Sequence, residues 1–184
     1  MNTLSERLDQ LTGTYTDIWT ALGSLGQGSI PDVMLPTPSD GIICTLWDAS
    51  QVQVLSGDLI SGDAFALHTT SLEEMQERNL PLGENLRMIG NMQMVYLYQE
   101  WDELHRHRIA KKLGVEYKKL TVPVFGDLRR FRHDIIHSKG ISTKQYSVET
   151  EVLSAFSEGT DVRFDVDCWF KMKAEIECWL SSLK

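Results

Sequence analysis

The chain has 184 residues, of which 42% are hydrophobic and 24% charged, a composition typical of one soluble globular domain. Its net charge of −8 argues against a broad basic surface for duplex DNA or anionic membranes, but it is compatible with a small basic pocket for phosphate groups. The first residues lack the layout of a signal peptide and no apolar run reaches the roughly 18 residues of a transmembrane helix, so we expect a cytoplasmic protein without membrane contact.

The first part of the chain predicts a helix followed by a β-hairpin. Apolar residues recur at three- and four-residue steps through residues 3–24, as they do on the buried side of a helix. Glycines and prolines then mark residues 23–41 as a long loop. Two β-rich runs at residues 42–47 and 52–55 are separated by a short polar stretch, which predicts a hairpin.

Helical patterns account for most of the chain after the hairpin. Thr70 or Ser71, with Glu74 at the matching offset, predicts the start of a short helix. Residues 84–113 give the longest helical pattern, and its second half is strongly charged. A last helix is predicted over residues 167–183 from its apolar stripe.

Two short strands are predicted between the later helices, at residues 146–153 and 160–167, the second because its polar and apolar residues alternate. Residues 115–123 are expected to be a linker. Together the patterns predict a single, mainly α-helical domain over residues 1–184 with minor β structure.

The helix predicted at residues 127–139 carries an unusual density of cations for an acidic chain. Asp127 is its expected N-cap and Gly140 its expected C-terminal stop. Its buried side is predicted to consist of Leu128, Phe131 and Ile135. Its polar side carries Arg129, Arg130, Arg132, His133 and His137, with Asp134 as the acid among them.

The geometry of this helix suggests a chemistry for the cations. On an ideal helix His133 and His137 lie one turn apart on the same side. Arg130 lies beside His137, whereas Arg132 lies at the border of the buried side. Such a group suits phosphodiester cleavage without a metal ion, because a histidine can exchange a proton with a ribose 2′-hydroxyl or a leaving 5′-oxygen and an arginine can stabilise charge on the phosphate. The alternative is a solvated helix face whose histidine caps the helix or pairs with a neighbour.

The stretch Arg-His-Asp-Ile-Ile-His at residues 132–137 resembles the signature of the HEPN superfamily (higher eukaryote and prokaryote nucleotide-binding domain). That signature is an arginine, usually followed by a polar residue, and then a histidine a few residues further on. Arg132 fits its shortest spacing and Arg130 its longest. The resemblance covers roughly residues 84–184 and implies an HEPN-like helical bundle, to which residues 1–83 would add the N-terminal helix and the β-hairpin.

The resemblance implies a metal-independent endoribonuclease that needs no cofactor. Family members commonly form homodimers in which the motifs of two chains make one composite cleft, and many act as toxins or in defence against phage. The implied partners are therefore a second copy of the chain, an RNA substrate, and an antitoxin or another partner protein.

The resemblance also implies residue roles. Carried over by position, Arg132 would stabilise the phosphate, His137 would act as general acid or base, and His133 would be the polar partner. Arg130 is the second candidate for the partner of His137, because the helix geometry places it nearer. The remaining candidates are Arg129 and Asp134 as supporting residues, and Glu100 and Asp102 as acids that orient the motif.

Two other interpretations stay open. A catalytically inactive HEPN module would dimerise and bind a partner protein or a nucleotide, and the acidic net charge favours this interpretation. A metal-dependent phosphohydrolase would use His133 and His137 as ligands. However, the chain lacks an HExxH motif and the flanking arginines would repel a divalent cation. The three cysteines show no CxxC spacing and are expected to be reduced structural thiols, so no metal site is predicted.

Overall fold

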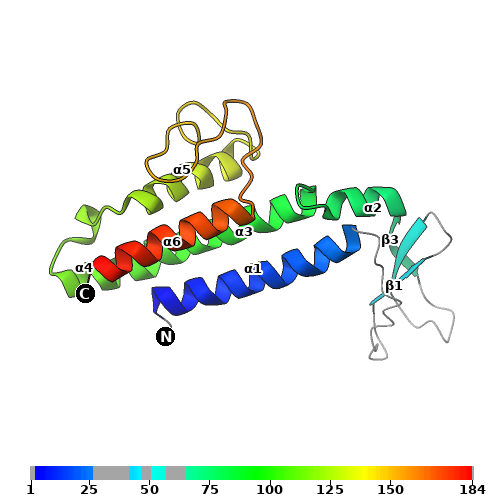
Figure 1. Ribbon diagram of the computed structural model, residues 1–184, viewed down its shortest axis with the longest axis horizontal. Helices are drawn as coiled ribbons and strands as arrows, with labels where there is room; N and C mark the ends of the chain where they lie inside the picture. Colours follow the sequence, from blue (N-terminus) through cyan, green and yellow to red (C-terminus); the bar gives the residue numbers. More distant parts are fainter. Residues whose placement is uncertain (1–2, 27–41, 47–50, 57–64, 184) are drawn as a thin grey trace. The chain divides into compact units, whose positions relative to one another are not determined.

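The protein is mainly helical, as predicted (Figure 1). The computed structural model describes residues 3–26, 42–46, 51–56 and 65–183. The chain forms two compact units, one made of residues 1–17 and 87–184 and the other of residues 18–86. Among the described helices, none is both long enough and apolar enough to cross a membrane.

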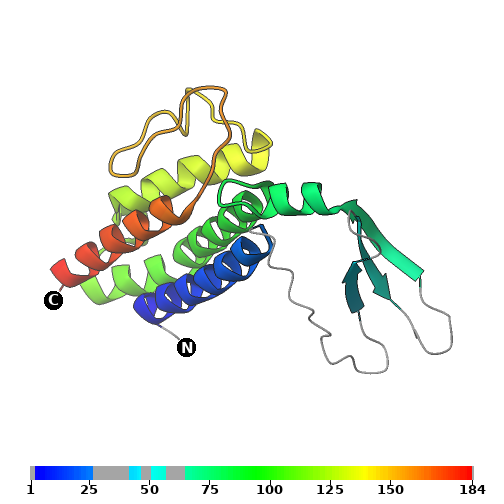
Figure 2. The ribbon, with the colours of Figure 1, turned by 45° about the vertical axis from the view of Figure 1, so that its right-hand side comes forward.

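The first unit is a bundle of helices that lie side by side in both ribbon views (Figures 1 and 2). Its elements are the start of α1 (Leu4–Gly26), most of α3 (Glu84–Glu100), the π-helical turn η1 (Trp101–His105), α4 (Arg106–Leu113), the 3₁₀ turn η2 (Tyr117–Lys119), α5 (Pro123–His137) and α6 (Val166–Ser182). The helical patterns at the start of the chain, at residues 84–113 and at the end of the chain are therefore confirmed. The long central pattern is one continuous run that contains a π-helical turn, which the sequence pattern did not indicate.

Two aromatic clusters join the helices of this unit. Trp169 of α6 is fully buried, stacks on Tyr15 of α1 with ring centroids 5.3 Å apart, and donates a hydrogen bond of 3.0 Å to Thr12. Trp101 of η1 stacks on Phe125 of α5 with centroids 3.9 Å apart. Buried aromatic pairs of this kind contribute both apolar area and specific geometry, so they set how the helices pack.

Residues 146–153 and 160–167 do not form the two predicted strands. The alternation in the second stretch instead buries Val162 and Phe164 in the core. The Asn91 side chain on α3 donates to the carbonyl of Val162 at 2.8 Å and accepts from the amide of Phe164 at 2.9 Å. The amide of Val162 also donates to the carbonyl of Gly140 at 2.7 Å, beside an isolated β-bridge between Ile141 and Asp161. The Asn91 side chain and the backbone of residues 140–142 together thus satisfy this stretch.

Helix α5 begins earlier than predicted, and Asp127 is not its N-cap. The helix starts at Pro123, whose fixed φ and missing N–H suit the first helical position. Asp127 lies in the second turn, is fully buried, and accepts hydrogen bonds of 2.8–2.9 Å from the backbone amides of residues 151–153. At the other end Gly140, with a φ of +76°, donates to the carbonyl of Asp134. The helix ends at His137, two residues before the predicted end, and both Lys139, with a φ of +56°, and Gly140 adopt the left-handed conformation beyond it. Gly140 is therefore part of the turn that follows the helix, where a positive φ favours glycine, but it does not directly follow the last helical residues as predicted.

The second unit contains the end of α1, a small sheet and a short helix. Strands β1 (Ile42–Leu46), β2 (Gln51–Ser56) and β3 (Phe65–Ser71) pair antiparallel in the order β1-β2-β3. The first two form the predicted hairpin, whereas β3 was not predicted. Helix α2 (Leu72–Asn79) starts with the predicted capping box, in which the side chains of Ser71 and Glu74 bond each other's backbone amides. The predicted loop at residues 23–41 lies mostly outside the described residues.

Candidate functional site

Helix α5 carries all the candidate cations, and its packing directs them to two sides. Leu128 and Phe131 are fully buried in the core, and Ile135 is half-buried at its margin, so the predicted buried side is correct. Residues on one flank face α3, η1 and α4. Residues on the other flank face the irregular segment 141–165.

Arg132 lies on the flank that faces α3. Its guanidinium carbon is 5.8 Å from the centre of the Tyr98 ring, within the range of a cation–π contact. Its Nε atom is buried and has no hydrogen-bond partner among the described residues. Burial and the nearby Asp102 raise the pKa of Tyr98, so its hydroxyl stays protonated beside the arginine. Arg132 is thus held by packing against Tyr98, and no acidic partner of its guanidinium occurs among the described residues.

The two histidines lie on the other flank. The ring of His133 stacks on Tyr146 at 3.7 Å between centroids and lies 4.8 Å from the ring of His137. The His137 side chain is exposed, and His133 lies between it and the segment 141–165. An exposed imidazole beside a fixed one is suited to proton transfer with a ligand in solution. Sequence reasoning missed Tyr146, because an irregular segment has no periodicity that would relate it to a helix.

Arg130 is engaged in ion pairs on the same flank as the histidines. Its guanidinium lies 3.3 Å from the carboxylate of Asp127 and 3.7 Å from that of Glu151. It therefore ties α5 to the segment 141–165. Helix geometry alone had placed Arg130 beside His137, but the ion pairs give it a structural task that Arg132 does not have.

Asp134 is not the surface acid among the cations that its place in the motif suggested. It is fully buried and accepts hydrogen bonds from the backbone amide of Thr143 at 2.8 Å, from its hydroxyl at 2.8 Å, and from the amide of Ser147 at 3.1 Å. Burial by itself would raise the pKa of Asp134, but the hydrogen bonds from Ser147 and Thr143 outweigh it and lower the pKa. The ionised carboxylate therefore fastens the start of the segment 141–165 to α5.

The two candidate orienting acids differ in position. Glu100 accepts a hydrogen bond of 2.7 Å from Arg7 of α1, so this carboxylate is paired with α1. Asp102 of η1 pairs with Arg106 at 3.1 Å and lines the same groove as Arg132. Asp102 is therefore the candidate whose position fits an orienting role.

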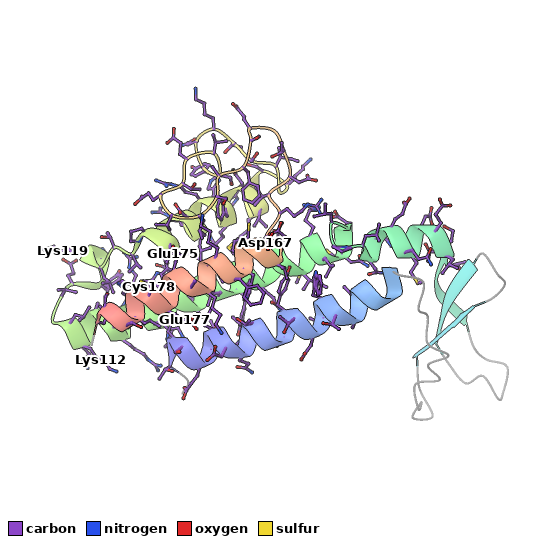
Figure 3. All side chains as sticks on the ribbon, in the orientation of Figure 1. Lys112, Lys119, Asp167, Glu175, Glu177 and Cys178 are labelled. Carbon is purple, nitrogen blue, oxygen red and sulfur yellow. The ribbon has the colours of Figure 1, made fainter. Side chains whose placement is uncertain are left out.

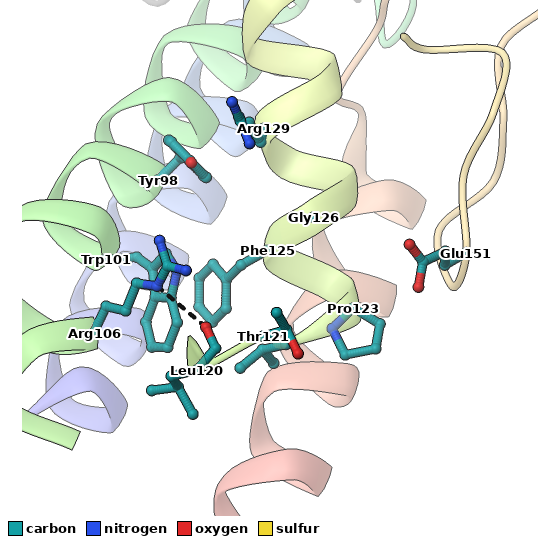
Figure 4. Close-up of a pocket in the computed structure, with 11 residues that line it drawn as sticks. Tyr98, Trp101, Arg106, Leu120, Thr121, Pro123, Phe125, Gly126, Arg129 and Glu151 are labelled. Atoms are coloured by element: carbon teal, nitrogen blue, oxygen red, sulfur yellow. Dashed lines mark hydrogen bonds between the residues drawn. The ribbon is translucent and has the colours of Figure 1, made fainter. Parts of the chain in front are cut away.

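The groove beside Arg132 lies between η1, α4 and α5. It has a volume of about 480 Å³, and its lining includes Tyr98, Asp102, Arg106, Lys118, Arg129 and Arg132. A second cavity of about 260 Å³ shares Tyr98, Arg106 and Arg129 with it (Figure 4). The groove therefore gathers basic side chains from three elements in a chain whose net charge is negative.

Among the described residues, no three histidine, cysteine, aspartate or glutamate side chains lie together in a way that would hold a metal ion. Comparisons of the chain with protein-family models, with curated proteins and with solved structures find no match.

Proposed function

We propose that the chain is a metal-independent endoribonuclease of HEPN type that acts as a homodimer. The observation that carries the proposal is that α5 holds both an exposed histidine, His137, and, on its other flank, an arginine, Arg132, that has no acidic partner among the described residues. Both side chains belong to the stretch that resembles the HEPN signature. The basic groove that Arg132 lines supplies a surface for a phosphate backbone.

The proposed reaction needs only side chains of this kind. A histidine takes the proton of a ribose 2′-hydroxyl, whose oxygen attacks the adjacent phosphorus. The bond from phosphorus to the 5′-oxygen breaks, and a second histidine donates a proton to that leaving oxygen. The products are a 2′,3′-cyclic phosphate and a free 5′-hydroxyl. Arg132 stabilises the negative charge that builds up on the phosphate oxygens in the transition state.

A second copy of the chain completes this scheme. One base and one acid are needed on opposite sides of the phosphate, and each chain has a single His137. His133 is half-buried and stacked on Tyr146, so we assign it the task of holding His137 in place. In a homodimer the two His137 side chains would act as the base and the acid.

Cleavage of RNA by purified protein tests the proposal. Single-stranded RNA is incubated with and without EDTA, beside the variants His137→Ala and Arg132→Ala. We expect EDTA-resistant cleavage that falls about 10²- to 10⁴-fold in His137→Ala and about 10²-fold or more in Arg132→Ala. Ile136→Ala is the matched control, because Ile136 is an exposed neighbour on the same helix. Cleavage that survives in both motif variants would contradict the proposal, and cleavage abolished by EDTA would favour a metal-dependent phosphohydrolase.

A role as a toxin or as an effector of phage defence is part of the proposal. Expression of the chain would then slow growth of the host cell, and His137→Ala would relieve this effect at an equal protein level. Equal toxicity of the wild type and the variant would contradict that role without bearing on cleavage in vitro.

A second candidate function is that of an inactive HEPN module that binds a partner protein. It is favoured by an apolar stripe on α3, where Met88, Met92 and Tyr96 recur every four residues and are 50%, 64% and 47% exposed. Contiguous exposed apolar side chains of this kind often mark interaction surfaces. A dimer without RNA cleavage in the assay above would support this candidate over the first.

A further inference from the structure

The groove beside Arg132 has a strongly uneven charge balance. Its lining carries four cations, Arg106, Lys118, Arg129 and Arg132, and two acids, Asp102 and Glu103. Asp102 pairs with Arg106, and Glu103 accepts a hydrogen bond from Gln99. Acidic residues lie elsewhere in the same unit, for example Asp167, Glu175 and Glu177 on α6 (Figure 3). The basic character of the groove is therefore local.

Three of the groove cations lack an acidic partner among the described residues: Lys118, Arg129 and Arg132. Lys118 and Arg129 are exposed, and the Nε of Arg132 is buried without a hydrogen-bond partner. Like charges brought together without counter-charges repel one another, and a buried donor without an acceptor is unfavourable. An anionic ligand in the groove would relieve the repulsion among the exposed cations.

The wall of the groove is held in place before any ligand binds. The Arg106 guanidinium donates to the carbonyl of Leu120 at 3.2 Å, a bond drawn in Figure 4, and to the carbonyl of Lys118 at 3.3 Å. Tyr117 stacks on His107 at 3.9 Å and lies 5.9 Å from the Arg106 guanidinium. These contacts fix the turn that carries Lys118 against α4. Less ordering is then needed on binding, which favours affinity.

The π-helical turn η1 lines part of the same groove. Asp102 and Glu103 belong to η1, and Arg106 follows it directly. A π-helical turn inserts a residue into a helix and rotates the side chains that follow, and such turns occur frequently at functional sites. The departure from regular helix geometry therefore coincides with the groove.

We propose that this groove binds the sugar–phosphate backbone of single-stranded RNA next to the bond that is cleaved, with Lys118 and Arg129 contacting phosphates. The inference rests on the proposed function for its choice of ligand. The path from Arg129 to His137 spans eight residues of α5, or about 12 Å along the helix axis, which is longer than one phosphate group. In this scheme the groove and His137, which lie on different flanks of α5, contact different nucleotides of one strand. A single strand fits better than a duplex, because the basic area is small and the chain as a whole is acidic.

Binding of a non-cleavable RNA tests this inference. A 2′-O-methyl oligonucleotide lacks the attacking hydroxyl, so its Kd can be measured over a range of salt concentrations. We expect Lys118→Ala and Arg129→Ala each to weaken binding about tenfold at low salt, and to lower the slope of log Kd against log salt by about 0.7. Both side chains are exposed, so neither variant should change the melting temperature.

Lys119→Ala is the matched control. Lys119 is the next residue along the chain (labelled in Figure 3), is exposed, lies 3.9 Å from Glu116, and does not line the groove. We expect this variant to bind as the wild type does. Equal affinities and equal salt slopes in Lys118→Ala, Arg129→Ala and Lys119→Ala would overturn the inference.

The outcome separates this inference from the proposed function. If cleavage needs His137 but binding does not depend on Lys118 and Arg129, the proposed ribonuclease function stands and RNA binding in the groove is rejected. If binding needs Lys118 and Arg129 but no RNA is cleaved, the groove remains an RNA-binding site and the proposed ribonuclease activity is rejected.

Discussion

The two flanks of helix α5 use charge in opposite ways. On the flank that faces the segment 141–165, Asp127 and Asp134 are fully buried and saturated with hydrogen bonds from that segment. On the flank that faces the groove, Arg129 and Arg132 have neither an ion pair nor a hydrogen bond among the described residues. One flank of α5 thus has its charged groups paired, and the other flank, called here the open flank, carries cations without partners among the described residues.

This difference between the two flanks suggests different roles for the acids and the cations of α5. Buried carboxylates that accept several backbone amides stabilise a fold, because removing them would leave those amides without partners. Cations in excess of the acids around them do little for the fold, and such arrangements are common where a protein binds or transforms an anion. The acids of α5 are therefore expected to control stability and the cations of the groove to control activity.

The largest effect on stability is expected from Asp127→Ala. The substitution removes the acceptor for the amides of residues 151–153 and leaves the Arg130 charge without its buried partner. We expect a loss of about 3–5 kcal/mol in the free energy of unfolding, measured by urea denaturation. Asp102→Ala serves as the control, because that side chain is 47% exposed and its pairing with Arg106 contributes only about 0.5 kcal/mol. Equal losses in the two variants would show that Asp127 does not organise the segment.

The role of Asp127 also shows where sequence patterns stop being informative. The helices at the start, in the middle and at the end of the chain were predicted correctly, because apolar periodicity reflects burial on one side of a helix. The buried side of the middle helix was predicted wrongly in part, since Met92 and Tyr96 are 64% and 47% exposed. An aspartate shortly before an apolar stripe is a reasonable N-cap candidate, yet Asp127 bonds to amides 24–26 residues further along the chain. No local pattern encodes a partner at that distance.

The stretch around Phe164 illustrates the same limit for strands. Alternation of polar and apolar residues signals that every second side chain is buried, and Val162 and Phe164 are indeed buried. The pattern does not say what satisfies the backbone, and here the Asn91 side chain and the backbone around Gly140 do so. The alternation therefore predicted the burial correctly and the hydrogen-bonded partner wrongly.

The sequence could indicate the candidate site residues, but it could not show which of them have a structural role and which are free to contact a ligand. Their clustering on one helix was visible from the sequence. Whether Arg130 or Arg132 is free to act depends on Glu151 and Tyr98, which only the fold brings near. Lys118 was not singled out, because nothing in its local sequence relates it to α5, and it lines the groove through the turn η2.

A smaller effect, with a distinctive pH dependence, is expected from Asp134→Asn. The pKa of Asp134 is lowered in the folded state, so its ionised form stabilises the fold at any pH above the ordinary pKa of aspartate and this contribution is lost as the pH falls through the lowered pKa. We expect the variant to be about 2 kcal/mol less stable than the wild type at pH 7, and the difference to shrink below about pH 4. Urea denaturation from pH 7 to pH 3 measures both. A difference that stays constant over this range would rule out ionisation of Asp134 as its source.

The smallest effect on stability is expected from Arg132→Ala, and it is the most informative about the open flank. The substitution removes the contact with Tyr98, which contributes about 0.5–1 kcal/mol. It also removes a buried Nε without a partner, whose presence is unfavourable by about 1 kcal/mol or more. The two effects oppose each other, so we expect the free energy of unfolding to change by less than about 1 kcal/mol while RNA cleavage is lost. Arg130→Ala is the matched comparison, because its ion pairs with Asp127 and Glu151 predict a larger loss of stability and a smaller loss of cleavage. If Arg132→Ala proves the less stable of the two, the unpaired arginine belongs to the scaffold, and the distinction between the two flanks of α5 does not hold.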